Sequence, residues 1–187
     1  MSTSAIGGNP LDTFPKRLLE RAQRHPDKIA IREKAFGIWQ EWSWRQMLEE
    51  VRALACGLAA LGMQRGDKVA IVGDNRPQLY WTMIAVQCIG GVPVPLYQDA
   101  VADEIQFVLD HAETRYAVVE DQEQVDKLLS VWDDCPRLEQ LIYEASRGLR
   151  EYGEPFLHAF AAIQAQGRIY DAEHPDFLAS IMGSATL

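Results

Sequence analysis

Three short stretches carry polar residues that could hold a ligand, and each follows an apolar run of strand length. They are residues 73–76, 97–101 and 120–124. In an open α/β sheet the ligand binds outside the carboxyl ends of the strands, so these are the loops to consider. The first is unsuited to phosphate, because it has one glycine and no hydroxyl side chain, and Asp74 would repel the anion. We expect Asn75 to cap the following helix and Arg76 to be a surface or interface cation.

The other residue types that could do chemistry are scattered. The four histidines have no cysteine or acid at ligand spacing, which argues against a zinc site. The acidic pairs Asp103-Glu104 and Asp133-Asp134 are expected on helix surfaces, whereas acid–base catalysis would require burial. We therefore predict no catalytic, cofactor-binding or metal-binding residue in this chain. The histidines are His25, His111, His158 and His174, and the tryptophans expected to pack in the core are Trp39, Trp42, Trp44, Trp81 and Trp132.

The elements that would position these loops alternate between strands and helices from residue 66 to residue 121. Apolar runs at 68–73, 92–97 and 116–119 predict strands, and residues 77–89 predict a helix between the first two. Ile105, Val108, Leu109 and Ala112 repeat at helical spacing before the third. The sequence therefore predicts an α/β fold, with a doubly wound, mostly parallel sheet flanked by helices and joined by right-handed crossovers.

Before this unit, the sequence predicts an N-terminal helix and a β-hairpin. Thr13 can cap a helix that begins near Pro15, and residues 28–32 and 38–42 predict two strands joined by a turn in which Gly37 takes positive φ. Ser43 and Gln46 fit a capping box at the start of a long helix, which residue 62, a glycine, is placed to end.

After the central unit, the pattern predicts a helix that ends at Cys135-Pro136 and a strand at 138–143. Phe156, Phe160 and Ile163 then indicate a short helix ending at Gly167. The regular spacing of apolar residues weakens over residues 168–187, which are expected to form a surface segment.

Composition narrows the class of protein. The 187 residues carry a net charge of −9 with 48% hydrophobic residues, which is typical of a globular chain and argues against nucleic acid as a partner. The apolar run at 80–97 is interrupted by glycines and prolines, so it predicts a buried helix and strand rather than a transmembrane segment. Residues 1–9 lack the features of a signal peptide, and the expected location is cytoplasmic. The three cysteines, expected to be buried free thiols, are Cys56, Cys88 and Cys135.

Several blocks in order resemble the opening third of long-chain fatty-acyl-CoA synthetases, which belong to the AMP-forming adenylating enzymes. The resemblance covers roughly residues 13–143, and residues 160–167 are similar to the family's helix upstream of its phosphate loop. The blocks are PDKIA at 26–30, LACGL at 54–58, LG at 61–62, GDKVAI at 66–71, NRP at 75–77, GGVPVPLY at 90–97 and VEDQEQV at 119–125.

The resemblance implies an activity for the whole enzyme that this segment alone would lack. Members of the family convert a carboxylate and ATP to an acyl-adenylate with Mg²⁺, and then transfer the acyl group to coenzyme A. The family's phosphate loop is absent, because residues 176–187 echo only its approach. We therefore expect a disordered leader at 1–12, the first α/β subdomain of a partial AMP-binding domain at 13–167, and a segment at 168–187 leading toward the missing loop.

For the whole enzyme the resemblance implies ATP, Mg²⁺ and coenzyme A as cofactors and a fatty acid as substrate, while no cofactor is expected for the segment alone. Peripheral membrane contact is left open. An isolated segment should self-associate, because its apolar surface and strand edges would lose the partners that the rest of the enzyme supplies.

Two other hypotheses remain. One is a stand-alone binding or regulatory module of flavodoxin-like or receiver-like fold, although the hydroxyl-rich loop of flavin binders and the acidic cluster with lysine of receivers are both missing. The other is a degenerate ligase fragment used for protein interaction.

Overall fold

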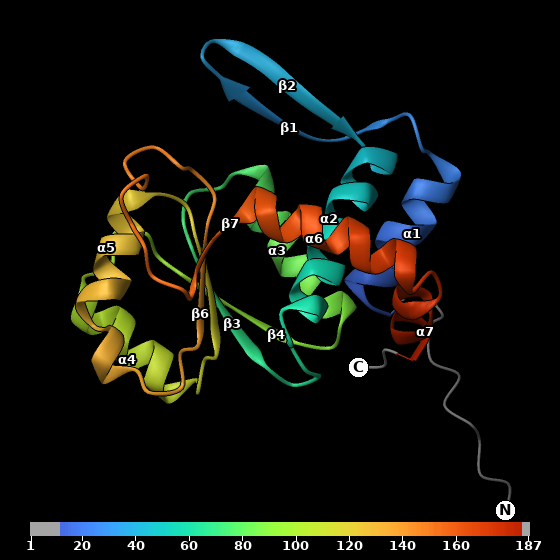
Figure 1. The fold of residues 1–187 in the computed structure, drawn as a ribbon. Helices are drawn as coiled ribbons and strands as arrows, with labels where there is room; N and C mark the ends of the chain where they lie inside the picture. The colour runs from blue at the N-terminus through green and yellow to red at the C-terminus, as the bar shows by residue number, and fades with distance from the viewer. Residues whose placement is uncertain (1–11, 185–187) are drawn as a thin grey trace, which may run out of the picture.

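The fold was determined as a computed structural model that describes residues 12–184 (Figure 1). Its centre is a five-stranded sheet with the order β4-β3-β5-β6-β7, in which every neighbouring pair is parallel. This is the doubly wound α/β sheet predicted from the sequence. The strands are β3 (Lys68–Val72), β4 (Val92–Leu96), β5 (Tyr116–Val119), β6 (Gln140–Tyr143) and β7 (Leu157–Ala159).

Each face of the sheet is covered by its own helices, as strand alternation requires. On one face Val69, Ile71 and Val118 pack beneath α2 (Trp44–Ala60), α3 (Pro77–Cys88) and α6 (Phe160–Glu173). On the other face Ala70 and Val119 pack beneath α4 (Ala102–His111) and α5 (Gln122–Ser130), which a 3₁₀ turn at Trp132–Asp134 follows. Figure 1 shows the two helical layers on opposite sides of the strands.

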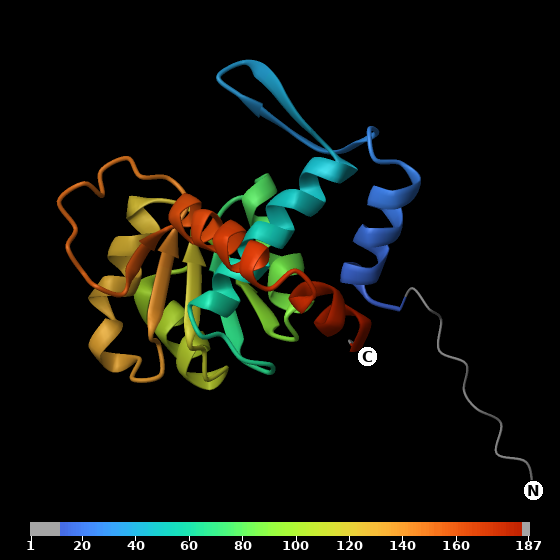
Figure 2. The same cartoon turned by 45° about the vertical axis from the view of Figure 1, so that its right-hand side comes forward.

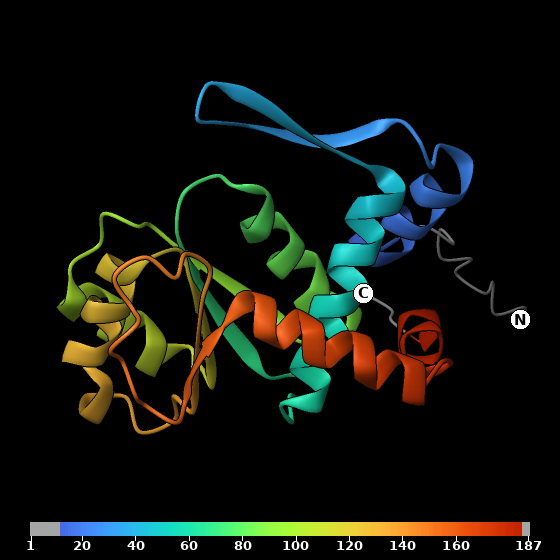
Figure 3. The same ribbon diagram turned by 45° about the horizontal axis from the view of Figure 1, so that its top comes forward.

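The predicted hairpin is confirmed and projects from the body of the molecule (Figures 2 and 3). It consists of β1 (Ile29–Ala35) and β2 (Ile38–Ser43), which pair antiparallel, and Gly37 has the expected positive φ of 82°. Before it, α1 (Phe14–Arg24) packs Leu18 against the core. Thr13 is the N-cap residue of α1, but its side chain makes no capping hydrogen bond.

The long helix α2 begins as the sequence predicts. The Ser43 hydroxyl accepts a hydrogen bond from the backbone N–H of Gln46, while the Gln46 side chain accepts one from the backbone N–H of Ser43. This reciprocal pair satisfies two N–H groups that a helix start leaves unpaired. At the other end Gly62 takes a φ of 93°, which suits the residue after a helix C-cap.

The prediction that a short helix ends at Gly167 is wrong. Helix α6 continues to Glu173, and Gly167 lies in its interior against α2. A methyl group on Gly167 would overlap the carbonyl oxygen of Ala53, and one on Gly57 would overlap that of Ile163. These glycines allow α2 and α6 to cross in close contact, which Figure 3 shows. The glycine therefore serves a tertiary contact rather than a helix end.

The rest of the C-terminal segment also differs from expectation. Phe156 lies before the short strand β7, which the sequence did not predict, and not in a helix. Residues 168–184 contain the end of α6 and a further helix α7 (Phe177–Ser184), which the sequence did not predict and which buries Leu178 and Met182 in the core. Of the predicted leader at 1–12, only Asp12 lies within the described residues, where it forms an ion pair with Lys16.

Candidate functional site

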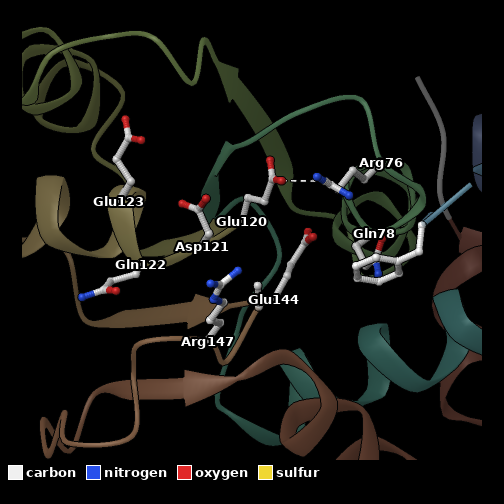
Figure 4. A pocket seen from close by; sticks show the side chains of 10 residues that line it. Arg76, Gln78, Glu120, Asp121, Gln122, Glu123, Glu144 and Arg147 are labelled. Carbon is white, nitrogen blue, oxygen red and sulfur yellow. Dashed lines mark hydrogen bonds and ion pairs between the residues drawn. The ribbon is translucent and has the colours of Figure 1, made fainter. Parts of the chain in front are cut away.

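Two of the three predicted loops meet at the carboxyl edge of the sheet. The chain runs from β3 outward to β4 and then returns to β5 on the other side, so the strand order reverses between β3 and β5. Ligands of doubly wound folds bind in the crevice at such a point. A crevice of about 630 Å³ lies there, and we call it the switch-point crevice (Figure 4). It is lined by Phe36, Arg76, Gln78, Glu120, Asp121, Gln122, Glu123, Glu144, Ala145 and Arg147.

A carboxylate of the protein itself uses the hydrogen-bond donors of this crevice. Glu120 accepts the backbone N–H of Asp74 at 2.6 Å and the Arg76 Nε–H at 2.5 Å. Gly73 allows this approach, because a Cβ there would lie 2.9 Å from the Cβ of Glu120. A phosphate in this place would have to displace Glu120, so the geometry does not favour anion binding.

The predicted roles of the first loop need correction. Asn75 is not the helix cap: Arg76 occupies the N-cap position of α3, and the Asn75 amide oxygen instead accepts a hydrogen bond from Tyr80 at 3.2 Å. Arg76 forms two ion pairs, one with Glu120 and one with Glu33 of the hairpin at 2.7 Å. It thereby links the hairpin to the end of β5. Pro77 does begin the helix, as predicted.

Sequence reasoning missed Glu144, which shares the crevice. Burial raises its pKa to about 8, and repulsion from Glu120 and then Glu33 acts in the same direction, while Arg76 acts against them. Glu144 follows directly on β6, so its position at the carboxyl edge could have been found from the predicted strand at 138–143. Its altered titration depends on three distant segments and has no local signal. The crevice therefore contains a carboxyl group that titrates near neutral pH.

The predicted loop at 97–101 does not join the switch-point crevice. Residues 97–99 line a separate depression of about 460 Å³ at the ends of β3 and β4. Leu79, Met83 and Leu96 give it a partly apolar wall, and Asp74 and Asn75 also line it. This depression lies beside the edge strand β4 rather than at the reversal of strand order.

Other candidate residues lie away from the crevice. The acidic pairs of α4 and of the 3₁₀ turn are exposed, as expected. The His158 ring contacts Gln140 at 2.6 Å, and burial lowers its pKa. Within residues 12–184, no group of three or more His, Cys, Asp or Glu side chains could hold a metal ion. The three cysteines are buried free thiols, as predicted, and burial raises the pKa of Cys88 to about 12.

The tryptophan prediction holds only in part. Trp81 is buried, and the Trp42 ring meets it edge-on with 5.5 Å between centroids. Trp39 is 54% exposed on the hairpin, beneath the guanidinium of Arg32, so the prediction that it packs in the core is wrong. Among the described helices, none is long and apolar enough to cross a membrane.

Comparison with known protein families identifies the family of this chain, which the fold alone does not. A family model described as AMP-binding enzyme matches residues 18–182. The chain belongs to this family. The resemblance to AMP-forming adenylating enzymes inferred from the sequence is thereby confirmed.

Curated relatives include ligases that are much longer than this chain. A long-chain-fatty-acid–CoA ligase, ACSBG2 of Xenopus laevis, is 28% identical over 142 residues, which are 76% of this chain and 19% of the relative. FadD15 of Mycobacterium bovis, named as the same kind of ligase, is 25% identical over 73% of this chain and 23% of its own length. The chain thus spans about a fifth of these ligases. An uncharacterized Mycobacterium tuberculosis protein, Rv1549, is 33% identical over 61% of this chain and 66% of its own length.

Solved structures agree on the fold. The A-PCP didomain of a carboxylic acid reductase from Segniliparus rugosus, in complex with AMP, has a TM-score of 0.72 at 19% identity, covering 82% of this chain and 26% of that one. A putative long-chain-fatty-acid CoA ligase from Rhodopseudomonas palustris has a TM-score of 0.68 at 24% identity, covering 81% and 36%. At these identities the likeness supports the fold alone.

Proposed function

We propose that this chain is the first α/β subdomain of a long-chain fatty-acid–CoA ligase. The observation that carries the proposal is the family match over residues 18–182, together with curated relatives that are named as long-chain ligases. The whole enzyme would use ATP and Mg²⁺ to form an acyl-adenylate and would then pass the acyl group to coenzyme A. Its location would be the cytoplasm.

In this proposal the chain provides a scaffold rather than reacting groups. Residues 13–167 would form the subdomain, and residues 168–187 would lead toward a phosphate loop. The acidic switch-point crevice supports this role, because Glu120 already takes the donors that a nucleotide phosphate would need. Among the described residues that line the crevice, there is no serine, threonine, cysteine or lysine that a neighbouring base could activate as a nucleophile.

Two measurements test the proposal. The chain alone should show no saturable micromolar binding of Mg·ATP by calorimetry and no acid-dependent release of pyrophosphate. A longer chain that adds a phosphate loop and C-terminal domain should form acyl-CoA from a fatty acid with AMP as co-product. ADP as the product would contradict the proposal, as would a folded longer chain that remains inactive with every fatty acid tried.

A second candidate is a short protein that acts through interaction with another chain. The observation that favours it is Rv1549, since the 118 matched residues make up 66% of that relative and it is therefore also short. Exposed apolar side chains on both faces of the hairpin and at the carboxyl edge of the sheet are available for contact with another chain. They are Phe36, Ile38, Trp39, Tyr97 and Val101.

We propose that self-association uses these exposed apolar side chains rather than the edge of β4. Val92 donates its N–H to Asp67, so strand alternation turns the nitrogens of Pro93 and Pro95 to the outer edge, where proline has no hydrogen to donate. Sedimentation at micromolar concentration tests the proposal. A defined dimer is expected, and a monomer that is unchanged on concentration and binds no hydrophobic dye would contradict it.

A further inference from the structure

The hairpin is fixed to the body at its base but lies nearly free beyond it. At the base, Trp44 donates its N–H to the carbonyl of Lys28, and Trp42 packs against Trp81. Farther out, the ion pair between Glu33 and Arg76 is the one polar side-chain contact that the described residues show between the hairpin strands and the loops of the sheet. The tip residue Phe36 is fully exposed, although it lines the switch-point crevice.

The register of the hairpin determines which face overhangs the crevice. Glu33 pairs with Gln40 and Ala35 with Ile38, whereas Arg32 pairs with Glu41 on the opposite face. Because Glu33 contacts Arg76, the Glu33 face is directed toward the sheet loops. The hairpin therefore overhangs the crevice through its tip residue Phe36, and one ion pair holds it in this position.

Arg76, the partner of Glu33 in this ion pair, is also held by Glu120. Glu120 binds Arg76 and the backbone N–H of Asp74, so the guanidinium is fixed relative to β5 (Figure 4). Glu144 extends toward the same guanidinium in Figure 4. The charged groups around Glu144 are Glu33 on β1, Arg76 after β3, Glu120 and Asp121 after β5, and Arg147 after β6.

Thermodynamic reciprocity connects Glu144 to the hairpin. The docked Glu33 carboxylate is one of the groups that favour the protonated form of Glu144. If docking of the hairpin disfavours ionisation, then ionisation must disfavour docking by the same factor. An ionised Glu144 would repel Glu33 and compete with it for the single positive charge of Arg76.

We propose that the hairpin is a latched lid over the switch-point crevice. The Glu33–Arg76 ion pair holds it closed, and loss of the proton from Glu144 releases it. Opening exposes the crevice between β3, β5 and β6 without disturbing the sheet, because the contacts at the hairpin base are independent of the latch.

Hydrogen–deuterium exchange of the full chain tests the latch. Protection factors, corrected for the intrinsic rate at each pH, are measured for the amides of β1 and β2 and for those of β3. In the wild type, hairpin protection should fall by about two- to fivefold from pH 7 to pH 9, the range that a partly exposed ion pair can contribute, while β3 is unchanged. Glu144→Gln, which imitates the protonated group, should keep high hairpin protection throughout this range.

The remaining variants separate the latch from hairpin stability. Glu33→Gln should give low hairpin protection that no longer depends on pH, and it should lower the pKa of Glu144 measured by NMR. Glu41→Gln makes the same chemical change on the opposite face and should retain the wild-type pH dependence. The proposal is overturned if wild-type protection is constant from pH 7 to pH 9, if Glu144→Gln shows the same fall, or if Glu33→Gln behaves as Glu41→Gln does.

Discussion

The α2–α6 crossing and the switch-point crevice are built on opposite principles. At the crossing, two helices approach until backbone touches backbone, and the residues that permit this are the small Gly57 and Gly167. At the crevice, segments from β1, β5 and β6 are held around one guanidinium, and a carboxyl group stays protonated near neutral pH. The first depends mainly on shape, although the ion pairs Arg52–Asp171 and Arg168–Glu50 also join the two helices. The second depends on charge and should respond to pH.

A change of shape at the crossing is expected to have a large effect. Gly167→Ala places a methyl group against the carbonyl of Ala53, and a rigid backbone cannot move aside as a side chain would. We expect a loss of about 3 kcal/mol in the free energy of unfolding, measured by urea denaturation. Gly153→Ala is the matched control, because a Cβ there meets nothing within 4 Å. Equal stability of the two variants would mean that the crossing is looser than described.

The next prediction concerns the pH dependence of the free energy of unfolding, to which Glu144 in the crevice contributes. The pKa of Glu144 is raised in the folded state from 4.5 to about 8, so between these values the unfolded chain has lost a proton that the folded chain retains. Stability should therefore fall as pH rises through this window, with a slope approaching about 1.4 kcal/mol per pH unit from this group. Below the window its contribution is fully present.

The matched variant for this prediction is Glu144→Gln, which removes the titration. Its unfolding free energy, measured by urea denaturation at several pH values, should lack this component of the slope. It should therefore gain on the wild type as pH rises from 5 to 8. Parallel curves for the two proteins would show that the crevice does not hold the proton.

The smallest effect is expected on the hairpin. Trp39 is 54% exposed and contacts Arg32 of the same hairpin, so Trp39→Ser should change the free energy of unfolding by less than about 0.5 kcal/mol. Trp81→Ala, at a buried position that also contacts the hairpin base, should cost about 3–5 kcal/mol. A large loss for Trp39→Ser would indicate that the hairpin face is covered in solution.

What the sequence predicts well is local or periodic. The capping box at Ser43 and Gln46, the positive φ of Gly37 and the parallel strands all follow from residues close together in the chain. The failures share a different cause. Glycine is common at helix ends, which is why the sequence suggested one at Gly167. In the structure this position has no side chain because α2 packs against it, and Gly57 of α2 lies 110 positions earlier in the chain.

The candidate site follows the same division. Its place at the carboxyl edge could be predicted, because strand order directs loops there. Its chemistry could not, since the pKa of Glu144 is raised by burial and then by Glu120 and Glu33, against the effect of Arg76, and these groups come from three separate segments. Asn75 also has a common capping side chain, yet the helix begins one residue later than that role requires.

The crossing of α2 and α6 also has a consequence for how the chain folds during synthesis. The surface of α2 around Ala53 and Gly57 is completed only by α6, so it stays uncovered until residue 167 has been made. At ordinary elongation rates, those 110 residues take roughly 5–20 s. During that interval the nascent chain presents an apolar groove beside a growing parallel sheet, and non-local contacts of this kind form late. The close fit between α2 and α6 therefore forms late in synthesis. Until it forms, the uncovered surface of α2 is what a chaperone would have to protect.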